Sequence, residues 1–155
     1  MSASSPKFSQ GIWLALRRFT ALPAARRTIS IEAVVALGVA RALILTVPMR
    51  WISRRLERQA AGARPSPRVE REVIREVGWA VRAAAPKTPW KSACLAQSLA
   101  GKWMLRRRGV DGVIRLAVAK DADGKLHAHA WLCAGDAVLT TADPAHRFTY
   151  VGDLD

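Results

Sequence analysis

A cysteine and two histidines in the C-terminal half of the chain are the residues whose types and spacing favour catalysis. Cys94 follows Ser92, a predicted N-cap, by two residues, so its thiol is expected in the first turn of a helix. Unpaired backbone N–H groups and the positive end of the helix dipole meet there, stabilise a thiolate and can bind an oxyanion. This placement predicts a nucleophile, although a cysteine is also an ordinary small packing residue.

The histidines lie on one predicted strand, over residues 126–133. Because side chains alternate along a strand, His127, His129 and Trp131 share a face, and strand position alone allows either histidine as the general base for Cys94. Such a base is normally oriented by a third group that accepts its other ring N–H.

Asp136 and Asp143 are the candidates for this orienting acid. Asp136 falls at a hairpin tip, five or more residues from the partner of His129, which is too far at ~3.3 Å per residue. A three-residue turn over 134–136 pairs His129 with Thr141 and brings Asp143 onto the His129 face, whereas a two-residue turn places it on the opposite face. Asp143 is the predicted acid, subject to this turn length.

Trp90, Gln97 and Trp131 are the candidate substrate-binding residues. Trp90 precedes Cys94 by four residues and follows two prolines, so it fits either a wall of the substrate cleft or buried packing. Gln97 lies one helical turn after Cys94, where it faces either the same cleft or solvent.

Periodicity and turn residues predict the elements that position these groups. Helices are predicted over 10–19, from Ser30 through Val47 towards Arg58, over 67–85 after a Ser66 cap, and from Ser92 to Arg108 with Gly109 closing it. Strands are predicted over 113–119, 126–133, 137–141 and 148–151. We expect an α+β fold in one domain, with an N-terminal helical portion (1–62) packed on a small antiparallel sheet of a catalytic core (66–155) and a linker near 60–67.

The charge is strongly basic. Lys and Arg number 25 against 12 Asp and Glu, a formal net charge of +13, and residues 1–70 hold twelve of these cations and three Glu. Such a balance indicates an acidic partner. A nucleic-acid-binding helical protein is an alternative, but aromatic residues are not interleaved with the basic segments, so no nucleic acid is expected.

The apolar stretch 33–47 is shorter than the about 20 residues of a membrane span and is interrupted by Arg41. A buried helix is therefore favoured and membrane contact is not expected, although the arginines that follow leave interfacial contact open. Residues 1–10 lack the basic-then-apolar order of a signal peptide, and no C-x-x-C pair is present to hold a metal. A cytoplasmic protein without metal or cofactor is expected.

Three segments together carry a resemblance to a known family: 92–100 (SACLAQSLA), 105–109 (LRRRG) and 128–132 (AHAWL). They resemble the transglutaminase-like cysteine peptidases of lasso-peptide biosynthesis, the B proteins that remove the leader from the precursor peptide. The resemblance covers roughly residues 32–151. It implies a papain/transglutaminase-like fold with a Cys-His-Asp triad, in which Cys94 matches the nucleophile, His129 rather than His127 the base, and Asp143 better than Asp136 the acid.

The resemblance also implies partners. The substrate would be a precursor peptide, with a threonine near the end of the leader as its specificity element, and an ATP-using lasso cyclase would take the released core. Residues 1–70 look helical and lack the strands of a leader-recognition domain, so the chain resembles the split form, which works with a separate recognition protein. A catalytically inactive scaffold of the same fold, and an amidase or acyltransferase using the same triad, remain the alternatives.

Overall fold

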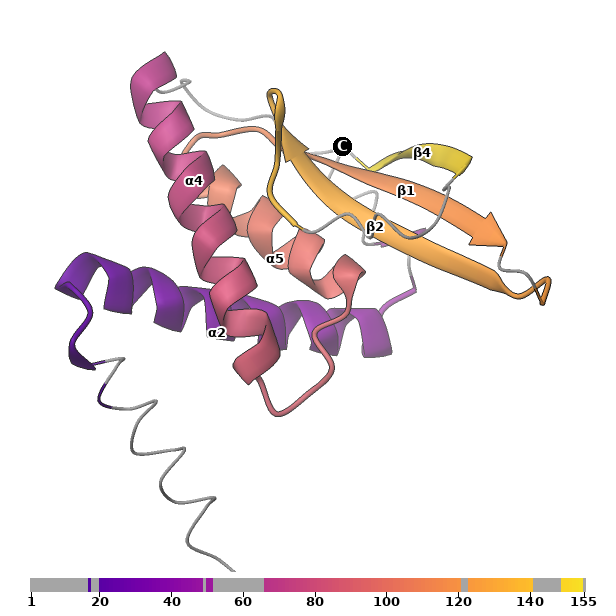
Figure 1. Ribbon diagram of the computed structural model, residues 1–155, viewed down its shortest axis with the longest axis horizontal. Helices are drawn as coiled ribbons and strands as arrows, with labels where there is room; N and C mark the ends of the chain where they lie inside the picture. The colour runs from indigo at the N-terminus through magenta and orange to yellow at the C-terminus, as the bar shows by residue number, and fades with distance from the viewer. Residues whose placement is uncertain are drawn as a thin grey trace, which may run out of the picture.

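Three helices and a four-stranded antiparallel sheet make up the described structure (Figure 1). The computed structural model describes Arg17 and residues 20–48, 50–51, 66–120, 123–140 and 149–154. Its helices are α2 (Ala24–Thr46), α4 (Pro67–Ala84), the short 3-10 helix η1 (Ala85–Lys87) and α5 (Cys94–Arg106). Its strands are β1 (Val113–Lys120), β2 (Leu126–Ala134), β3 (Ala137–Val138) and β4 (Thr149–Leu154). The predicted α+β class is confirmed.

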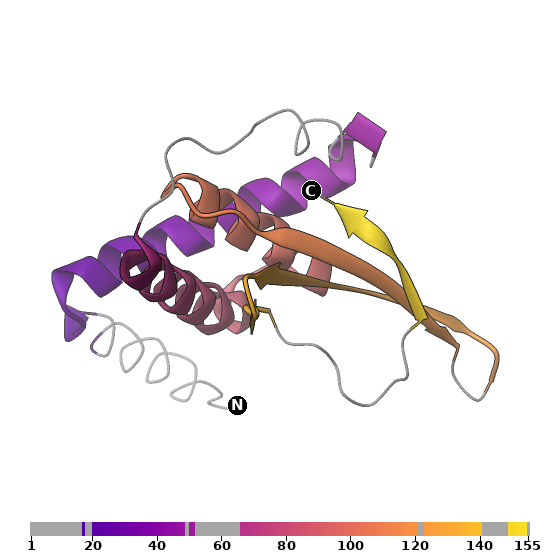
Figure 2. The ribbon, with the colours of Figure 1, turned by 90° about the horizontal axis from the view of Figure 1, so that it is seen from above.

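The helices gather on one side of the sheet, whose strand order is β3-β2-β1-β4 (Figure 2). Helix α5 packs against β2 and β1, and also against α2 and α4. The fully buried Leu37 of α2, Val77 of α4 and Met104 of α5 belong to the core that joins these elements. Helix α5, which begins at Cys94, is therefore the central element of the fold.

Several predicted boundaries are confirmed to within one residue. Helix α4 begins directly after Ser66, with Pro67 at its first position, where a missing N–H costs nothing. Helix α5 is followed by Gly109 at φ 72°, the left-handed conformation predicted for its end. Strands β1 and β2 occupy their predicted ranges to within one residue.

Other predicted boundaries are wrong. The helix expected from Ser30 begins at Ala24, because the Ser30 hydroxyl donates to the Arg26 carbonyl within the helix (2.7 Å) and does not cap it. Strand β3 ends at Val138, short of the predicted 141, and β4 spans 149–154 rather than 148–151. The predicted helix over 10–19 (except Arg17), the helix towards Arg58 and most of the linker lie outside the described residues.

The turn between β2 and β3 also differs from the prediction. Ala134 pairs with Ala137 and Cys133 with Val138, so the turn holds two residues, Gly135 and Asp136, and not three. Gly135 has φ 54°, which glycine adopts without strain. The register that placed Asp143 on the His129 face is therefore not present at the start of β3.

Helix α2 is buried on one face only. Ala33, Ala36 and Leu37 are buried against α4 and α5, but Val35 and Leu45 are 53% and 67% exposed. The expectation of a buried helix thus holds for its inner face alone. By length and composition α2 could cross a membrane, a criterion that the core helix of a soluble protein also meets.

Leu132 of β2 packs closely against two glycines, Gly101 of α5 and Gly112 just before β1. A Cβ atom at Gly101 would lie 2.7 Å from Leu132 Cδ2, and one at Gly112 would lie 3.0 Å from Leu132 Cδ1. Leu132 is fully buried, so neither branch has space to turn away. A side chain at position 101 would therefore force Leu132 to shift.

We predict that Gly101→Ala lowers the free energy of unfolding by about 1 kcal/mol in urea denaturation. Overpacking a core costs roughly 1–3 kcal/mol, which outweighs the gain of about 1 kcal/mol in helix propensity. Gly152→Ala is the control, because a Cβ at Gly152 meets nothing within 4 Å. An alanine variant at 101 as stable as the wild type would show that Leu132 can move.

An ion pair joins α2 to the end of α5. The two terminal guanidinium nitrogens of Arg108, Nη1 and Nη2, donate to Glu32 at 3.1 and 2.6 Å, and Arg107 lies 3.6 Å from the same carboxylate. The Glu32 side chain is only 16% exposed. The hydrogen bonds from Arg108 hold the pKa of Glu32 below its ordinary value, although burial opposes them.

A lowered carboxyl pKa in the folded state stabilises the fold above the unfolded-state pKa, about 4.3, and this stabilisation is lost as the pH falls through the folded-state pKa. We therefore expect Glu32→Gln to cost about 2 kcal/mol at neutral pH, with the difference from wild type shrinking below about pH 4. Urea denaturation across this range measures it. The exposed Glu72→Gln is the control, and a pH-independent difference would contradict the assignment.

Candidate active site

Cys94 is the first residue of α5. Its N-cap is Ala93, not the predicted Ser92, and no side chain caps the helix. The Ser92 hydroxyl instead lies 2.7 Å from the Thr88 hydroxyl, which explains why the predicted cap is wrong. The N–H groups of the first turn have no partner within their own helix, so the thiol lies where a thiolate is stabilised. Cys94 is half-buried and packs against the edge of the core.

Hydrogen bonds hold the segment that leads into Cys94. Thr88 Oγ1 lies 2.9 Å from the Ala85 carbonyl and 3.0 Å from the Trp90 carbonyl, and Gln97 Nε2 donates to the Ser92 carbonyl at 2.8 Å. The side chain one turn after the thiol thus bonds the backbone two residues before it. This contact fixes how the chain enters α5.

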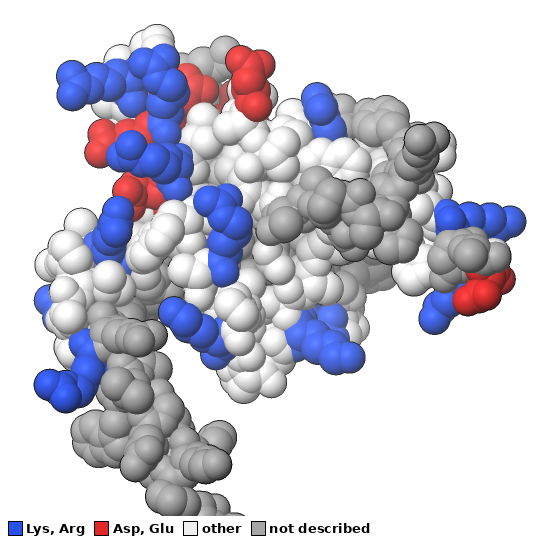
Figure 3. All heavy atoms as spheres, viewed as in Figure 1, with Lys and Arg blue, Asp and Glu red and all other residues white. Residues whose placement is uncertain are grey.

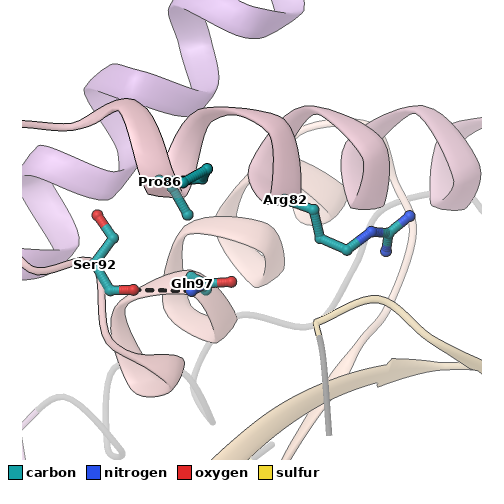
Figure 4. Close-up of a pocket in the computed structure, with 5 residues that line it drawn as sticks. Arg82, Pro86, Ser92 and Gln97 are labelled. Carbon is teal, nitrogen blue, oxygen red and sulfur yellow. Dashed lines mark hydrogen bonds between the residues drawn. The ribbon is translucent and has the colours of Figure 1, made fainter.

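A hollow of about 260 Å³ lies beside this segment, lined by Arg82, Ala85, Pro86, Ser92 and Gln97. Figure 4 shows Gln97 bonded to Ser92 on one side of it, with the Arg82 guanidinium directed away from both. Its volume is enough for a side chain of a bound peptide. The structure therefore places Gln97 in a hollow close to Cys94, and contact with substrate remains a prediction.

Trp90 packs against α2. A Cβ at Gly38 would lie 3.3 Å from Trp90 Cζ2, so the indole occupies the notch that this glycine leaves. Its Nε1 is buried and has no hydrogen-bond partner among the described residues. This contact accords with the packing role weighed for Trp90, and a role in the substrate cleft remains a prediction.

His129 lies in the middle of β2, opposite Ala117 of β1, and is half-buried. Its ring lies beside that of Trp131, with centroids 5.9 Å apart and planes inclined by 30°, so these two residues share a face as predicted. Leu132 faces α5, as its distance from Gly101 shows. Because β1 and β2 pair in an unbroken register, His129 lies on the opposite side of β2 from Leu132.

Cys94 and His129 therefore lie on two elements that pack together, α5 and β2, and His129 is on the face of β2 opposite to the one that Leu132 turns towards α5. Strand β3 pairs only with Cys133 and Ala134 and ends four residues short of His129. The Cys94–His129 pair stays a prediction.

The orienting acid is not located by the structure. Asp143 lies outside the described residues, and Asp136 occupies the exposed tip of the turn between β2 and β3, as predicted. Within the described ranges, no three His, Cys, Asp or Glu side chains gather closely enough to hold a metal ion.

Residues that the sequence did not single out hold the end of β3. The Leu139 N–H donates to the Leu132 carbonyl (2.8 Å), but the Leu139 carbonyl accepts from Arg82 of α4, and the Leu132 N–H donates to Thr140 Oγ1 (2.9 Å). The buried Ser98 lies 3.3 Å from the same hydroxyl. A side-chain oxygen thus replaces a backbone carbonyl where the chain leaves β3.

These four residues, Arg82, Ser98, Leu139 and Thr140, form what we call the Thr140 cluster. Ser98 lies one helical turn after Cys94, and the Leu132 N–H lies three residues after His129. The Thr140 cluster thus links the helix that carries the thiol to the strand that carries the imidazole. The only sequence signals for it were two hydroxyl residues among apolar neighbours, Ser98 in a helix and Thr140 in a strand.

We predict that Thr140→Val lowers the free energy of unfolding by roughly 1–3 kcal/mol, because it leaves the buried Leu132 N–H without an acceptor. Thr140→Ser keeps the hydroxyl and is expected to lie close to wild type. Chemical denaturation of the three proteins measures this difference. A valine variant as stable as wild type would mean that the Thr140 cluster does not hold the chain.

These features define an α+β protein with a cysteine at the first residue of its central helix and a histidine on the adjoining strand. The chain belongs to the transglutaminase-like superfamily, whose family model matches residues 33–152. That match confirms the fold family and is consistent with a cysteine-peptidase-like fold. No curated protein and no solved structure gives a significant match to the chain.

Proposed function

We propose that the protein is a cysteine peptidase that removes the leader from a lasso-peptide precursor. The observation that carries this proposal is the family match over residues 33–152 together with Cys94 at the first residue of α5. The three segments that resemble the lasso-peptide B proteins add the substrate. Cys94 and His129 lie in two of these segments.

In the proposed reaction the Cys94 thiolate attacks the carbonyl carbon of the scissile peptide bond. The oxyanion is bound by N–H groups of the first turn of α5, the C–N bond breaks, and the His129 imidazolium gives its proton to the leaving amine. His129 then takes a proton from water, whose oxygen attacks the thioester and releases the leader as a carboxylate. The resemblance assigns Asp143 to hold the imidazole through its other ring N–H, which requires the chain to leave the register of the two-residue β2–β3 turn before position 143.

The geometry sets a requirement for this reaction. The His129 ring would have to meet the Cys94 thiol, and the segment after Thr140, which carries Asp143, would have to bring that carboxylate to the ring. The Thr140 cluster fixes the starting point of that segment. His127 lies on the same face of β2, two residues nearer the tip of the β1–β2 hairpin, and is expected to be dispensable for cleavage.

The partners follow from the same proposal. A separate leader-recognition protein would bring the precursor, and an ATP-using cyclase would join the released amine of the core into a macrolactam. The chain would act in the cytoplasm. An amidase or acyltransferase would use the same residues with a different substrate or acceptor.

We expect the wild type to release a leader-length fragment from the cognate precursor, as measured by mass spectrometry, and Cys94→Ala to release none. His129→Ala is expected to slow cleavage by about 10²–10⁴-fold, and His127→Ala to leave it near the wild-type rate. Each protein is assayed with and without the recognition protein.

Equal cleavage by wild type and Cys94→Ala would rule out Cys94 as the nucleophile. A requirement for His127 in place of His129 would reverse the assignment of the base. If neither protein cleaves with the recognition protein present, the inactive-scaffold alternative is favoured.

A further inference from the structure

The outer face of α2 is apolar and exposed over most of its length. Its large members, each at least 38% exposed, are Ile31, Val34, Val35, Val39, Leu43 and Leu45. Together with Gly38 and Ala42 between them, we call these residues the α2 strip. The strip is roughly 22 Å long at 1.5 Å per residue, and a continuous apolar surface of this kind marks an interaction site.

The charge around the α2 strip is of one sign. Glu32 is the single acidic residue of α2, and Arg108 and Arg107 bind it. Arg27 and Arg41 are spaced by seven residues on either side of Val34, so they lie along one edge of the strip. In Figure 3 the acidic side chains gather on the upper part of α4 and at the β1–β2 hairpin, and the visible lower part of the molecule shows only basic ones.

The α2 strip also lies beside the segment that leads to Cys94. Figure 1 shows the connection from α4 to α5 passing across α2, and Trp90 of that connection packs into the notch at Gly38. The α2 strip is therefore bordered by the indole of Trp90, which lies three residues before the N-cap of α5. A molecule bound beside Gly38 would contact Trp90, which lies four residues before Cys94.

We propose that the α2 strip is the docking surface for the separate leader-recognition protein, through an apolar ridge bordered by carboxylates on that protein. This inference rests on the proposed function. The arginine edge and the net charge of +13 favour an acidic partner and disfavour a second copy of this chain, whose arginines would meet. Three of the six large residues of the α2 strip are valines and none is Phe or Trp, whereas a lipid-facing helix is typically rich in Trp, Phe and Leu.

The test is calorimetric titration of the full-length chain with the recognition protein. We expect the double variant Val35→Glu, Val39→Glu to raise Kd at least about tenfold, because it places carboxylates against an acidic-edged apolar ridge. Val69→Glu is the matched control, since Val69 is a similarly exposed helical valine (48%) on α4. Kd for the wild type should rise with ionic strength, and Arg41→Glu should weaken that dependence.

A second double variant, Val35→Thr with Val39→Thr, keeps the shape of the surface and tests the strip if the glutamates disturb folding. Unfolding midpoints establish that each variant is folded. Unchanged Kd values in the folded α2 variants, or no binding by the wild type, would overturn the proposal. The proposal would also be overturned if the α2 variants still bound the recognition protein but no longer bound anionic phosphatidylglycerol vesicles. The same holds if they still bound the recognition protein but no longer formed a dimer that the wild type forms.

Binding and cleavage are read separately, so the two proposals fail in different ways. Binding that depends on the α2 strip, without cleavage under any condition, would support this docking surface and reject the peptidase. Cleavage that depends on Cys94 and on the recognition protein, but not on the α2 strip, would support the peptidase and reject this surface.

Discussion

The packing of Leu132 against Gly101 and Gly112 is the constraint on which the other features of the structure depend. It holds α5 against β2 so closely that a side chain at position 101 would displace Leu132. Because α5 also packs against α2 and α4, this one contact sets the position of the helical layer on the sheet. It also fixes the side of β2 that faces α5, and therefore the side on which His129 lies. Interiors this closely packed transmit small changes, so a shift at Leu132 would reach both ends of α5.

Much of the fold could be predicted from the sequence because the relevant signals are local. Alternation gave β1 and β2, and Gly109 gave the end of α5. The failures arose where a residue is engaged by a partner distant in sequence or by a competing local bond. Ser92 bonds Thr88 and therefore does not cap α5, and Ser30 bonds a carbonyl within α2. The turn at Gly135 admits two or three residues with the same glycine, so the sequence could not fix its register.

The candidate site could be predicted only in its parts. A cysteine at a helix start and a histidine on a strand are recognisable by residue type, and the family match supports them. Their relative placement depends on Leu132 facing α5 and on the Thr140 hydroxyl that replaces a backbone carbonyl, and neither produces a periodic signal. Likewise, the net charge did not show which arginines form contacts within the fold. Arg108 binds Glu32 and Arg82 binds the Leu139 carbonyl, so these two serve the fold.

For the proposed peptidase, these contacts indicate what a docked partner would contribute. The Gln97–Ser92 bond fixes the chain just before Cys94. The Thr140 cluster ties Ser98, one helical turn after Cys94, to Thr140. The imidazole, however, lies on the face of β2 opposite to Leu132, and in the proposed reaction it would meet the thiol past the edge that β3 leaves uncovered. A protein docked on the α2 strip would touch Trp90, whose segment carries the N-cap of α5. Such a partner would deliver the leader and could bias the position of Cys94 relative to that edge, which joins substrate capture to assembly of the catalytic pair in one binding event.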